Sequence, residues 1–291
     1  MKLSIIIINY KTYLLTKQTI QSILNQNLTF NYEIILVDNY SNDGSIEQIE
    51  NDFLNVNHLK IIRNPENGGF SKGNNVGLKE ATGEFILLLN SDTSLGKNTL
   101  LRCIKYIENK NFKFNKKIGA LGCKVVLEDG TLDHACKRGF PTPKASFYYL
   151  VGLDKKNPKK YGQYKATYLD ENEIGEVDCL TGAFMLMPKE VLDKVGFLDE
   201  QFFMYGEDID LCFRIKEAGY RIVYYPKVET VHFKGGSSKK QKNIMIYHFH
   251  NAMWLFYKKH YKNRESFLIT QMVKLGISLR YTLVLLKNLM R

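Results

Sequence analysis

Cysteines are few in this 291-residue chain, and no two of them form a Cys-x-x-Cys pair. The five are odd in number and widely spaced: Cys103, Cys123, Cys136, Cys179 and Cys212. A disulfide framework needs an even set and a zinc knuckle needs close pairs, so the spacing argues against both. The pattern is typical of a protein kept in a reducing compartment.

A long apolar run near the start is also missing. The first apolar stretch, residues 3–8, is followed at once by Asn9 and Tyr10, and it is too short for the apolar core of a secretory signal. We therefore expect synthesis in the cytoplasm.

Acidic residues are almost absent from the last fifth of the chain. Beyond Phe233 there are twelve Lys and Arg residues and one acid, Glu265, so the whole net charge of +11 lies there. The rest of the chain is neutral. A neutral body with a basic tail predicts contact between the tail and an anionic surface, either a membrane or a nucleic acid.

Hydrophobic residues make up 44% of the chain, and one run of them is followed directly by three polar residues. Residues 85–89 are five consecutive large apolar residues, which is typical of a strand buried on both faces of a sheet. Ligands of open α/β sheets collect at the carboxyl ends of such strands. Here that end carries Asn90, Ser91 and Asp92, which predict a ligand site unless they only form a polar turn.

Strand and helix patterns alternate through the first half. Apolar runs predict further strands at residues 3–9, 32–37 and 59–62, with helices at 16–25, after Gly44, and from Ser71, which can cap its helix. The alternation predicts an α/β fold with a parallel, doubly wound sheet.

The second half has fewer regular signals. We expect a strand at residues 118–126, a loop-rich segment at 133–172, helices at 189–195 and 208–218, and strands at 220–225 and 228–232. Two helices are expected in the tail, at 245–261 and 265–290. Lys274, Arg280 and Lys287 interrupt the last, apolar helix, which favours a helix lying at a membrane interface over one that spans it. Packing back onto the domain is the alternative.

Several stretches match, in order, the motifs of a known family. They are residues 4–10 (SIIIINY), 37–45 (VDNYSNDGS), 67–77 (NGGFSKGNNVG), 89–92 (LNSD), 182–183 (GA), 197–211 (FLDEQFFMYGEDIDL) and 232–237 (HFKGGS). The ordered set resembles glycosyltransferase family 2, in the branch of the bacterial rhamnosyltransferases. The resemblance implies a GT-A type fold, with a Rossmann-like mixed, mainly parallel sheet flanked by helices and a basic helical tail.

The same resemblance implies a division of the chain. Residues 1–237 would form the glycosyltransferase domain, with a nucleotide-binding half at 1–95 and an acceptor-binding half at 96–237. Residues 238–291 would form the membrane-associating tail.

The resemblance also implies a nucleotide site. Its expected residues are Asn9, Asp38, Asn39, Gly68, Gly69, Lys72, Asn90 and Ser91. The Asp38 carboxylate would accept the imide N–H of uracil or thymine, an edge that adenine does not offer; a turn residue is the alternative. Gly68 and Gly69 would let the backbone approach a phosphate at a helix start, and Lys72 would add a charge unless it is a solvated surface lysine.

Asp92 and His232 are the metal ligands that the resemblance implies. A Mn²⁺ or Mg²⁺ ion would neutralise the diphosphate leaving group, and a histidine ligand favours manganese. Asn90 stands where the fuller motif has an acid, which should weaken metal affinity. An ordinary strand-end histidine is the alternative for His232.

On the acceptor side, the resemblance places the catalytic base at Asp208 and acceptor contacts at Gly182, Ala183, Tyr205 and Glu207. A carboxylate positioned against the attacking hydroxyl can serve as that base. The alternative is that Glu207, Asp208 and Asp210 only complement the dipole of the helix that starts there.

We therefore predict an inverting transferase that moves a sugar, rhamnose or a similar one, from a dTDP- or UDP-sugar to a hydroxyl of a glycan or lipid-linked glycan precursor. It would act in the cytoplasm, on the inner face of the cell membrane, with the tail on anionic lipid. The competing hypothesis is a nucleic-acid or anionic-surface binding protein on an inactive scaffold. Tyr247, Trp254, Phe256 and Tyr257 could stack on bases. No recognised nucleic-acid motif accompanies them, so we expect no nucleic-acid partner.

Overall fold

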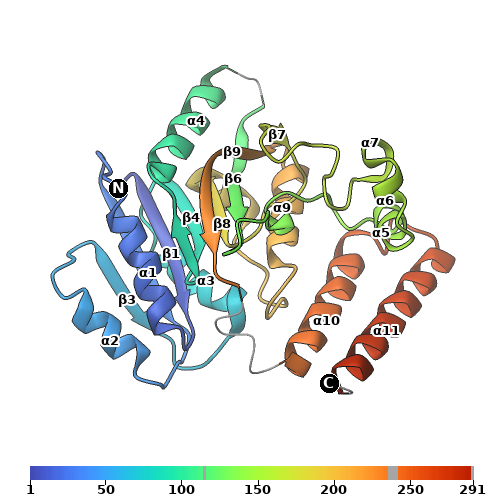
Figure 1. Ribbon diagram of the computed structural model, residues 1–291, viewed down its shortest axis with the longest axis horizontal. Coiled ribbons are helices and arrows are strands. Elements are labelled where there is room, and N and C mark those ends of the chain that lie inside the picture. The colour runs from blue at the N-terminus through green and yellow to red at the C-terminus, as the bar shows by residue number, and fades with distance from the viewer. Residues whose placement is uncertain (114–115, 235–241, 290–291) are drawn as a thin grey trace.

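The computed structural model describes residues 1–113, 116–234 and 242–289, and its centre is a mixed sheet (Figure 1). Over these ranges the sheet has nine strands in the order β3-β2-β1-β4-β8-β6-β9-β5, with β7 paired to β9. The strands are β1 (Leu3–Asn9), β2 (Tyr32–Asp38), β3 (Leu59–Arg63), β4 (Phe85–Asn90), β5 (Thr93–Leu95), β6 (Ile118–Val126), β7 (Gly175–Glu176), β8 (Phe184–Pro188) and β9 (Arg221–His232).

Helices precede, connect and follow these strands. They are α1 (Tyr13–Leu24), α2 (Ser45–Asp52), α3 (Gly69–Glu80), α4 (Thr99–Lys113), the short 3-10 helix η1 (His134–Cys136), α5 (Pro143–Leu150), α6 (Leu153–Lys156), α7 (Pro158–Tyr161), α8 (Lys189–Val195), α9 (Glu207–Glu217), α10 (Lys242–His260) and α11 (Phe267–Leu289). The mixed α/β architecture expected from the sequence is confirmed.

The parallel half of the sheet brings its polar strand ends to one edge. β1 runs parallel to β2 and β4, and the register sets Asn9 beside Asp38 and Ile8 beside Asn90. The inner residues of β1, β2 and β4 are almost all buried, as expected for strands covered on both faces. The first polar residues after these runs therefore meet at the carboxyl edge.

The second half of the sheet departs from parallel order. β8 is antiparallel to β4 and to β6, whereas β6 and β9 are parallel. The two closing strands expected at 220–225 and 228–232 are one strand, β9, with a register shift against β6 after Tyr225. Pro226 lies at that shift, where a residue without a backbone N–H would break a regular ladder.

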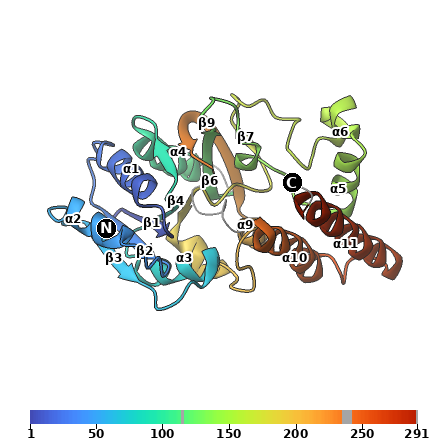
Figure 2. The ribbon, with the colours of Figure 1, turned by 60° about the horizontal axis from the view of Figure 1, so that its bottom comes forward.

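Helices cover both faces of the sheet; in Figure 2, α1 and α4 lie on one side and α3 and α9 on the other. Gly77 allows α3 to pack close to β1, since a Cβ at this position would lie only 2.6 Å from Ile6 Cγ2. The expected cap at Ser71 is wrong: α3 starts two residues earlier, with Gly68 as its N-cap. The Ser71 hydroxyl instead donates to the Phe202 carbonyl at 2.6 Å, which ties α3 to the loop before α9.

The segment expected to be loop-rich, residues 133–172, contains η1 and α5 to α7. Side chains of Thr142 and Asn157 accept the free N–H groups at the starts of α5 and α7. Lys137 is buried here, and its ammonium donates to the carbonyls of Ala166 and Leu169 at 3.0 and 2.8 Å. The turns that follow α7 therefore fold back onto a buried lysine, and the short helices before them were not expected from the sequence.

The two tail helices have different surroundings. α10 packs on the domain through a buried apolar cluster of Phe202, Phe213, Ala252, Phe256, Tyr257 and Tyr261. α11 lies beside α10, on the side away from the sheet (Figures 1 and 2). By length and composition α11 could cross a membrane, and only 6% of its most apolar window is buried.

Candidate active site

A cleft opens along the carboxyl edge of β1, β2 and β4. Its empty volume, including the open mouth, is about 790 Å³. Five residues expected at the nucleotide or metal site line it: Asn39, Gly69, Asn90, Ser91 and Asp92. The rest of the lining is Ile8, Tyr10, Thr12, Asn67, Phe70, Phe203, Met204 and, from α10, Met245. No sequence motif predicted that α10 would contribute to the wall of the cleft.

Asn9 and Asp38 lie behind this cleft in a buried hydrogen-bond network. Asn9 Nδ2 donates to Asp38 Oδ1 at 2.7 Å, and the Ser41 hydroxyl donates to the same oxygen at 2.5 Å. Asp38 Oδ2 accepts the backbone N–H of Ser41 at 3.1 Å. The protein thus uses both oxygens of Asp38, and Oδ2 keeps the greater spare capacity to accept a further hydrogen bond.

Asn39, Asn67 and Gly69 form the next part of the wall. Asn39 Nδ2 donates to Asn67 Oδ1 at 2.9 Å and to the Gly69 carbonyl at 3.0 Å. Gly69 has a φ of +80°, and a Cβ there would lie 2.2 Å from the Phe203 carbonyl oxygen. Glycine is therefore required by the contact with the loop before α9, as well as by any approach of a ligand.

Gly68 and Lys72 are placed differently from the expectation. Gly68 caps α3, and a Cβ on it would meet the Lys72 side chain at 2.5 Å. The Lys72 ammonium pairs with Glu66 at 2.5 Å on the exposed surface, and neither Gly68 nor Lys72 lines the cleft. In this conformation Lys72 matches the surface-lysine alternative.

Asp92 and His232 come together because of strand pairing. β5 starts directly after Asp92 and pairs with the end of β9, with Thr93 opposite His232. His232 Nε2 lies 3.2 Å from Asp92 Oδ1, and His232 Nδ1 lies 3.1 Å from Asp133 Oδ2. Burial alone would lower the pKa of His232, but the hydrogen bonds to Asp133 and Asp92 raise it to about 9.

Asp133 is a site residue that the sequence reading missed. It is buried, it also accepts from Lys234 Nζ at 2.7 Å, and these partners hold its pKa below the usual range although burial opposes this. A carboxylate on the far nitrogen of a histidine is the usual way to orient a metal-binding imidazole. Nothing in the sequence pattern marks Asp133, which follows a turn far from both partners.

The side chains around Asp92 suit a metal ion that takes only some of its ligands from the protein. Within the described ranges, no group of three or more His, Cys, Asp or Glu side chains is arranged to hold an ion. Asp92 and His232 converge, and the Asn90 side chain lies beside them, with Nδ2 3.4 Å from His232 Nε2 and with a buried Oδ1 that has no hydrogen-bond partner among the described residues. Two converging ligands and an orphaned oxygen fit an ion whose other ligands are water and diphosphate oxygens.

Asp208 stands at the start of α9 and pairs with a residue that the sequence did not reveal. Arg138 Nη2 donates to Asp208 Oδ2 at 2.7 Å and also reaches the Leu180 carbonyl at 3.3 Å. Arg138 comes from the excursion between β6 and β7, 70 residues away in sequence. The carboxylate expected to be a base is therefore fixed in direction by a guanidinium.

Glu207, next to Asp208, is buried without a full set of partners. Its side chain is 6% exposed, and Oε2 has no hydrogen-bond partner within the structure described. Burial, followed by the neighbouring Asp208 carboxylate, raises the pKa of Glu207 to about 8. Burial beside the Asp208 carboxylate thus favours the protonated form of Glu207.

Gly182 and Ala183 join the two sides of the cleft. The Ala183 carbonyl accepts the N–H of Asn90 at 3.2 Å. A Cβ at Gly182 would lie 3.2 Å from Phe70 Cε1 and 3.9 Å from Asp208 Cβ. Phe70 lines the cleft, so Asp208 lies next to its wall. Tyr205, with a φ of +69°, packs edge-on against Phe249 of α10 at 5.6 Å.

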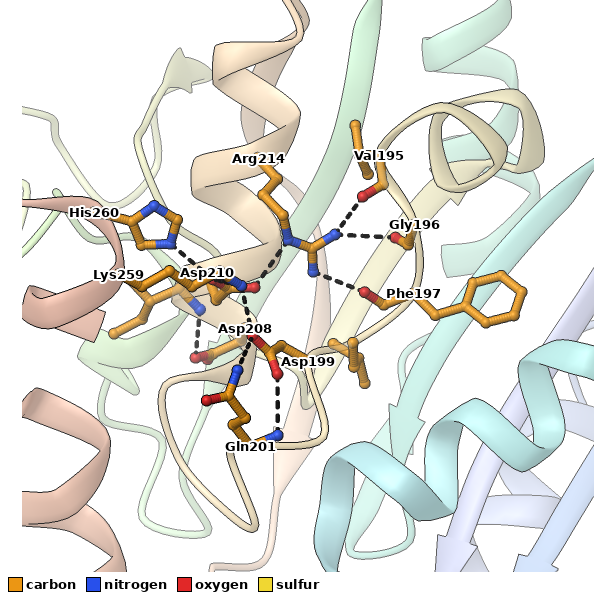
Figure 3. Close-up of polar contacts among 12 residues, drawn as sticks. Val195, Gly196, Phe197, Asp199, Gln201, Asp208, Asp210, Arg214, Lys259 and His260 are labelled. Carbon is orange, nitrogen blue, oxygen red and sulfur yellow. Dashed lines mark hydrogen bonds and ion pairs between the residues drawn. The ribbon is translucent and has the colours of Figure 1, made fainter. Parts of the chain in front are cut away.

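Asp210 belongs to a separate network that joins α9 to α10 (Figure 3). It is fully buried and accepts from Arg214 Nε at 2.9 Å, Lys259 Nζ at 2.7 Å and His260 Nε2 at 2.7 Å. Burial opposes its charge, yet His260 and Lys259 lower the pKa of Asp210 to about 2. Asp210 thus does more than complement the helix dipole: it anchors the first tail helix.

Comparison with models of protein families shows to which family the chain belongs. The model described as "Glycosyltransferase like family 2" matches residues 2–246. The chain belongs to this family. The match ends inside α10, so the family region runs a little beyond the boundary at 237 expected from the sequence.

Two curated relatives are rhamnosyltransferases by name. Rhamnosyltransferase WbbL of Escherichia coli (strain K12) is 31% identical over 173 residues, which is 57% of this chain and 61% of that protein. The N-acetylglucosaminyl-diphospho-decaprenol L-rhamnosyltransferase of Mycobacterium tuberculosis (strain H37Rv) is 24% identical over 77% of this chain and 73% of that protein.

Solved structures share the fold. S. aureus TarS in complex with UDP superposes with a TM-score of 0.60 at 21% identity, over 88% of this chain and 64% of that chain. The mannosyltransferase PcManGT from Pyrobaculum calidifontis, in complex with GDP-Man and Mn²⁺, gives 0.60 at 16% identity, over 96% and 70%. The expected GT-A type fold is confirmed. This chain spans less than two thirds of the length of WbbL and TarS.

Proposed function

We propose that the protein is an inverting transferase that moves a sugar, rhamnose or a similar one, from a dTDP- or UDP-sugar to a hydroxyl of a cell-surface glycan precursor. Residues 1–95 would bind the nucleotide and 96–237 the acceptor, with Asn9, Asp38, Asn39, Gly68, Gly69, Asn90 and Ser91 on the donor side. The rhamnosyltransferase names of the relatives and the UDP bound to TarS support this class of donor.

The observation that carries the proposal is one cleft with a different chemistry on each side. Asp92 lines the cleft at the end of β4 and meets His232, which lies behind it. Asp208 is not among the described residues that line the cleft, but it lies close to Gly182, which in turn lies close to Phe70 of the cleft wall. An inverting transfer is a single displacement at the anomeric carbon. It needs a base for the attacking hydroxyl and stabilisation of the leaving diphosphate, and it needs no enzyme nucleophile.

Each side contributes one of these parts. Asp208 would take the proton from the acceptor hydroxyl, with its carboxylate held in direction by Arg138. Protonated Glu207 has no charge to compete for that role. Gly182, Ala183 and Tyr205 would shape the acceptor side, where a side chain larger than glycine at position 182 would press on Phe70.

Asp92 and His232 would hold Mn²⁺ or Mg²⁺, with Asp133 orienting the imidazole. Such an ion neutralises the charge that develops on a diphosphate leaving group. The Mn²⁺ in the PcManGT structure supports this choice of cofactor. Since only two protein ligands converge, the ion should bind weakly to the empty enzyme.

A thermal-shift panel tests the donor. dTDP-sugars, UDP-sugars and GDP-mannose would each be added with and without Mn²⁺, because a ligand that binds the folded state raises its stability. We expect a rise with dTDP- or UDP-sugars that grows when Mn²⁺ is present. If GDP-mannose were the one donor that raised the melting temperature, the assignment of uracil or thymine as the nucleobase would be wrong.

Membrane association is the second part of the proposal. On α11, Leu268, Met272, Leu275, Leu279, Leu283 and Leu286 are all more than half exposed. Their spacing puts them on one stripe, opposite the side that packs on α10. Lys274, Arg280 and Lys287 lie off this stripe on the same helix. We infer that the stripe enters an anionic lipid surface, which would place the protein on the inner face of the cell membrane.

Paired leucine substitutions test this inference. The double variant Leu275→Ser/Leu279→Ser should lose binding to anionic vesicles by about 10-fold or more, since each leucine contributes more than 1 kcal/mol of apolar burial. Leu14→Ser/Leu54→Ser removes two leucines that are equally exposed elsewhere and should bind normally. If the parent ignores vesicles and forms a dimer that needs Leu275 and Leu279, a second copy covers the stripe instead.

The nucleic-acid alternative is not favoured. Of the tail aromatics that could stack on bases, Phe256 and Tyr257 are buried against the domain and α11. The basic residues Lys259 and His260 are committed to Asp210.

A further inference from the structure

α10 is a middle layer between the domain and the exposed stripe of α11. One side of α10 faces the domain through Ala252, Phe256 and His260. The opposite side meets α11, where Tyr257 Oη and Thr270 Oγ1 are 2.9 Å apart. Figures 1 and 2 show the two helices side by side along their length. A site between them would lie just below the surface that we expect to touch lipid.

Such a groove exists between α10 and α11. Its empty volume, including the open mouth, is about 560 Å³. His250, Asn251 and Trp254 line it from α10, and Lys274, Ser278 and Tyr281 from α11. None of its lining residues is an acid. The groove therefore combines aromatic walls, small polar groups and one cation.

His250, which lines the groove, has one ring nitrogen without a hydrogen-bond partner among the described residues. Its side chain is 5% exposed, and Nδ1 lies 2.7 Å from the Ile246 carbonyl oxygen, which can only accept, so Nδ1 carries a hydrogen. Nε2 is buried and has no hydrogen-bond partner among the described residues. In the neutral imidazole this nitrogen is an acceptor, so it is suited to a hydroxyl donor.

Lys274 supplies the charge. Its ammonium lies 6.0 Å from the centre of the Trp254 ring, over the groove that both residues line. An ammonium beside an aromatic wall suits a phosphoester, whose oxygens accept while its carbon skeleton packs on the ring. No carboxylate among the described residues that line the groove neutralises it.

We propose that this groove binds the headgroup of an anionic membrane lipid, one that carries both a phosphodiester and free hydroxyl groups. Lys274 would meet the phosphate, a headgroup hydroxyl would donate to His250 Nε2, and Trp254 and Tyr281 would pack against the carbon atoms. The acyl chains would continue into the bilayer beside the stripe of α11. The proposal rests on the membrane association above and adds a selectivity that charge alone cannot give.

Vesicles of matched charge test that selectivity. Phosphatidylglycerol and phosphatidylethanol both carry one net negative charge, but only the first has a headgroup with free hydroxyls, and the second has no headgroup hydrogen-bond donor at all. Co-flotation of the full chain should show tighter binding to phosphatidylglycerol vesicles by about 3- to 10-fold, the worth of one or two hydrogen bonds. Equal binding to both would overturn the headgroup proposal and leave membrane association intact. Binding to neither would overturn membrane association itself.

Three variants locate the selectivity. His250→Phe keeps a ring but removes the acceptor, so the ratio should fall to about one. Lys274→Gln removes the exposed cation without touching a buried group, and it should also lower the ratio. Lys287→Gln removes the same charge from α11 outside the groove; it should weaken binding to both lipids by about 5-fold and keep their ratio.

Two results would count against the proposal. If His250→Phe and Lys274→Gln, both with melting temperatures near the parent, keep the parent's ratio, the groove does not read the headgroup. Soluble glycerol 3-phosphate, titrated without vesicles, distinguishes the source of the ligand. Saturable, Lys274-dependent binding of this compound together with a lipid ratio of one would assign the groove to a soluble polyol phosphate and overturn the lipid.

Discussion

The proposed donor and acceptor sides of the cleft are built in different ways. On the proposed donor side, Asn9, Asp38 and Asn90 are the last residues of β1, β2 and β4, and Asp92 comes two residues after β4. The register of β1 with β2 and β4 brings these three strand ends together. On the proposed acceptor side, Asp208 lies in the first turn of α9, and its partner Arg138 comes from the excursion after β6. One side depends on sheet geometry, and the other on contacts between distant segments.

The two sides also differ in how charge is handled. The donor side keeps a protonated His232 between Asp92 and Asp133. The acceptor side keeps a charged Asp208–Arg138 pair beside a protonated Glu207. On the proposed donor side, a metal ion can therefore replace the proton of His232. On the proposed acceptor side, the Asp208 carboxylate is held in a fixed direction, and the charge of Glu207 is removed by a proton. The predictions below test this difference.

The largest effect is expected on the acceptor side. Asp208→Asn should lower kcat by about 10²- to 10⁴-fold, because an amide cannot take the proton of the acceptor hydroxyl. Donor affinity, measured by calorimetry, should stay within about 2-fold, since the lost contact is made with the acceptor. Asp193→Asn, an exposed change on α8, is the control. Near-normal turnover of Asp208→Asn would remove it from the role of base.

The next largest effect is expected on the donor side. Asp92→Ala should lower activity by about 100-fold, because metal stabilisation of a leaving group is worth several kcal/mol. Ser91→Ala should be mild, and Asn90→Ala intermediate at most. Asp133→Asn should weaken Mn²⁺ binding by about 10-fold through the orientation of His232. Full activity in excess EDTA would show that no ion is used and that another cation meets the diphosphate.

A smaller effect is expected at the back of the donor side. Asp38→Asn should weaken the binding of dTDP or UDP by about 10-fold if the carboxylate accepts the imide N–H, while kcat at saturating donor stays near the parent. Ser41→Ala is the matched control, because it removes one hydrogen bond to Asp38 but leaves the charge. If both variants bind the nucleotide normally and only melt earlier, Asp38 is a turn residue of the buried network.

The contrast explains what the sequence could predict. Strand ends can be located from short apolar runs, and Asn39, Asn90 and Asp92, which stand at or just after two of these ends, line one cleft. Their roles in binding stay predictions. The convergence of Asp92 with His232 was also predicted, but only through the family resemblance. Its physical cause, the antiparallel pairing of β5 with β9, leaves no local pattern.

The residues that the sequence did not reveal come from segments without periodic signals. Arg138 and Asp133 lie in the excursion after β6, where short helices hide among turns and where long-range contacts decide the structure. Lys72 illustrates a different limit of the sequence. It stands in a stretch that matches the family motif, but its side chain pairs with Glu66 outside the cleft. Side-chain direction depends on neighbours that a motif does not specify.

The smallest effect concerns Glu207 and tests how the acceptor side handles charge. Its pKa of about 8 in the folded protein exceeds the value of an unfolded glutamate, so its contribution to stability is complete below about pH 4.5 and is lost as pH rises through 8. Glu207→Gln is neutral at every pH. It should therefore match the parent near pH 4 and melt about 2–4 °C higher at pH 8.5 for each kcal/mol regained. Glu190→Gln, on the exposed side of α8, should change neither value. A constant difference between Glu207→Gln and the parent across this range would mean that Glu207 is charged, and that Asp208 shares the acceptor side with a second base.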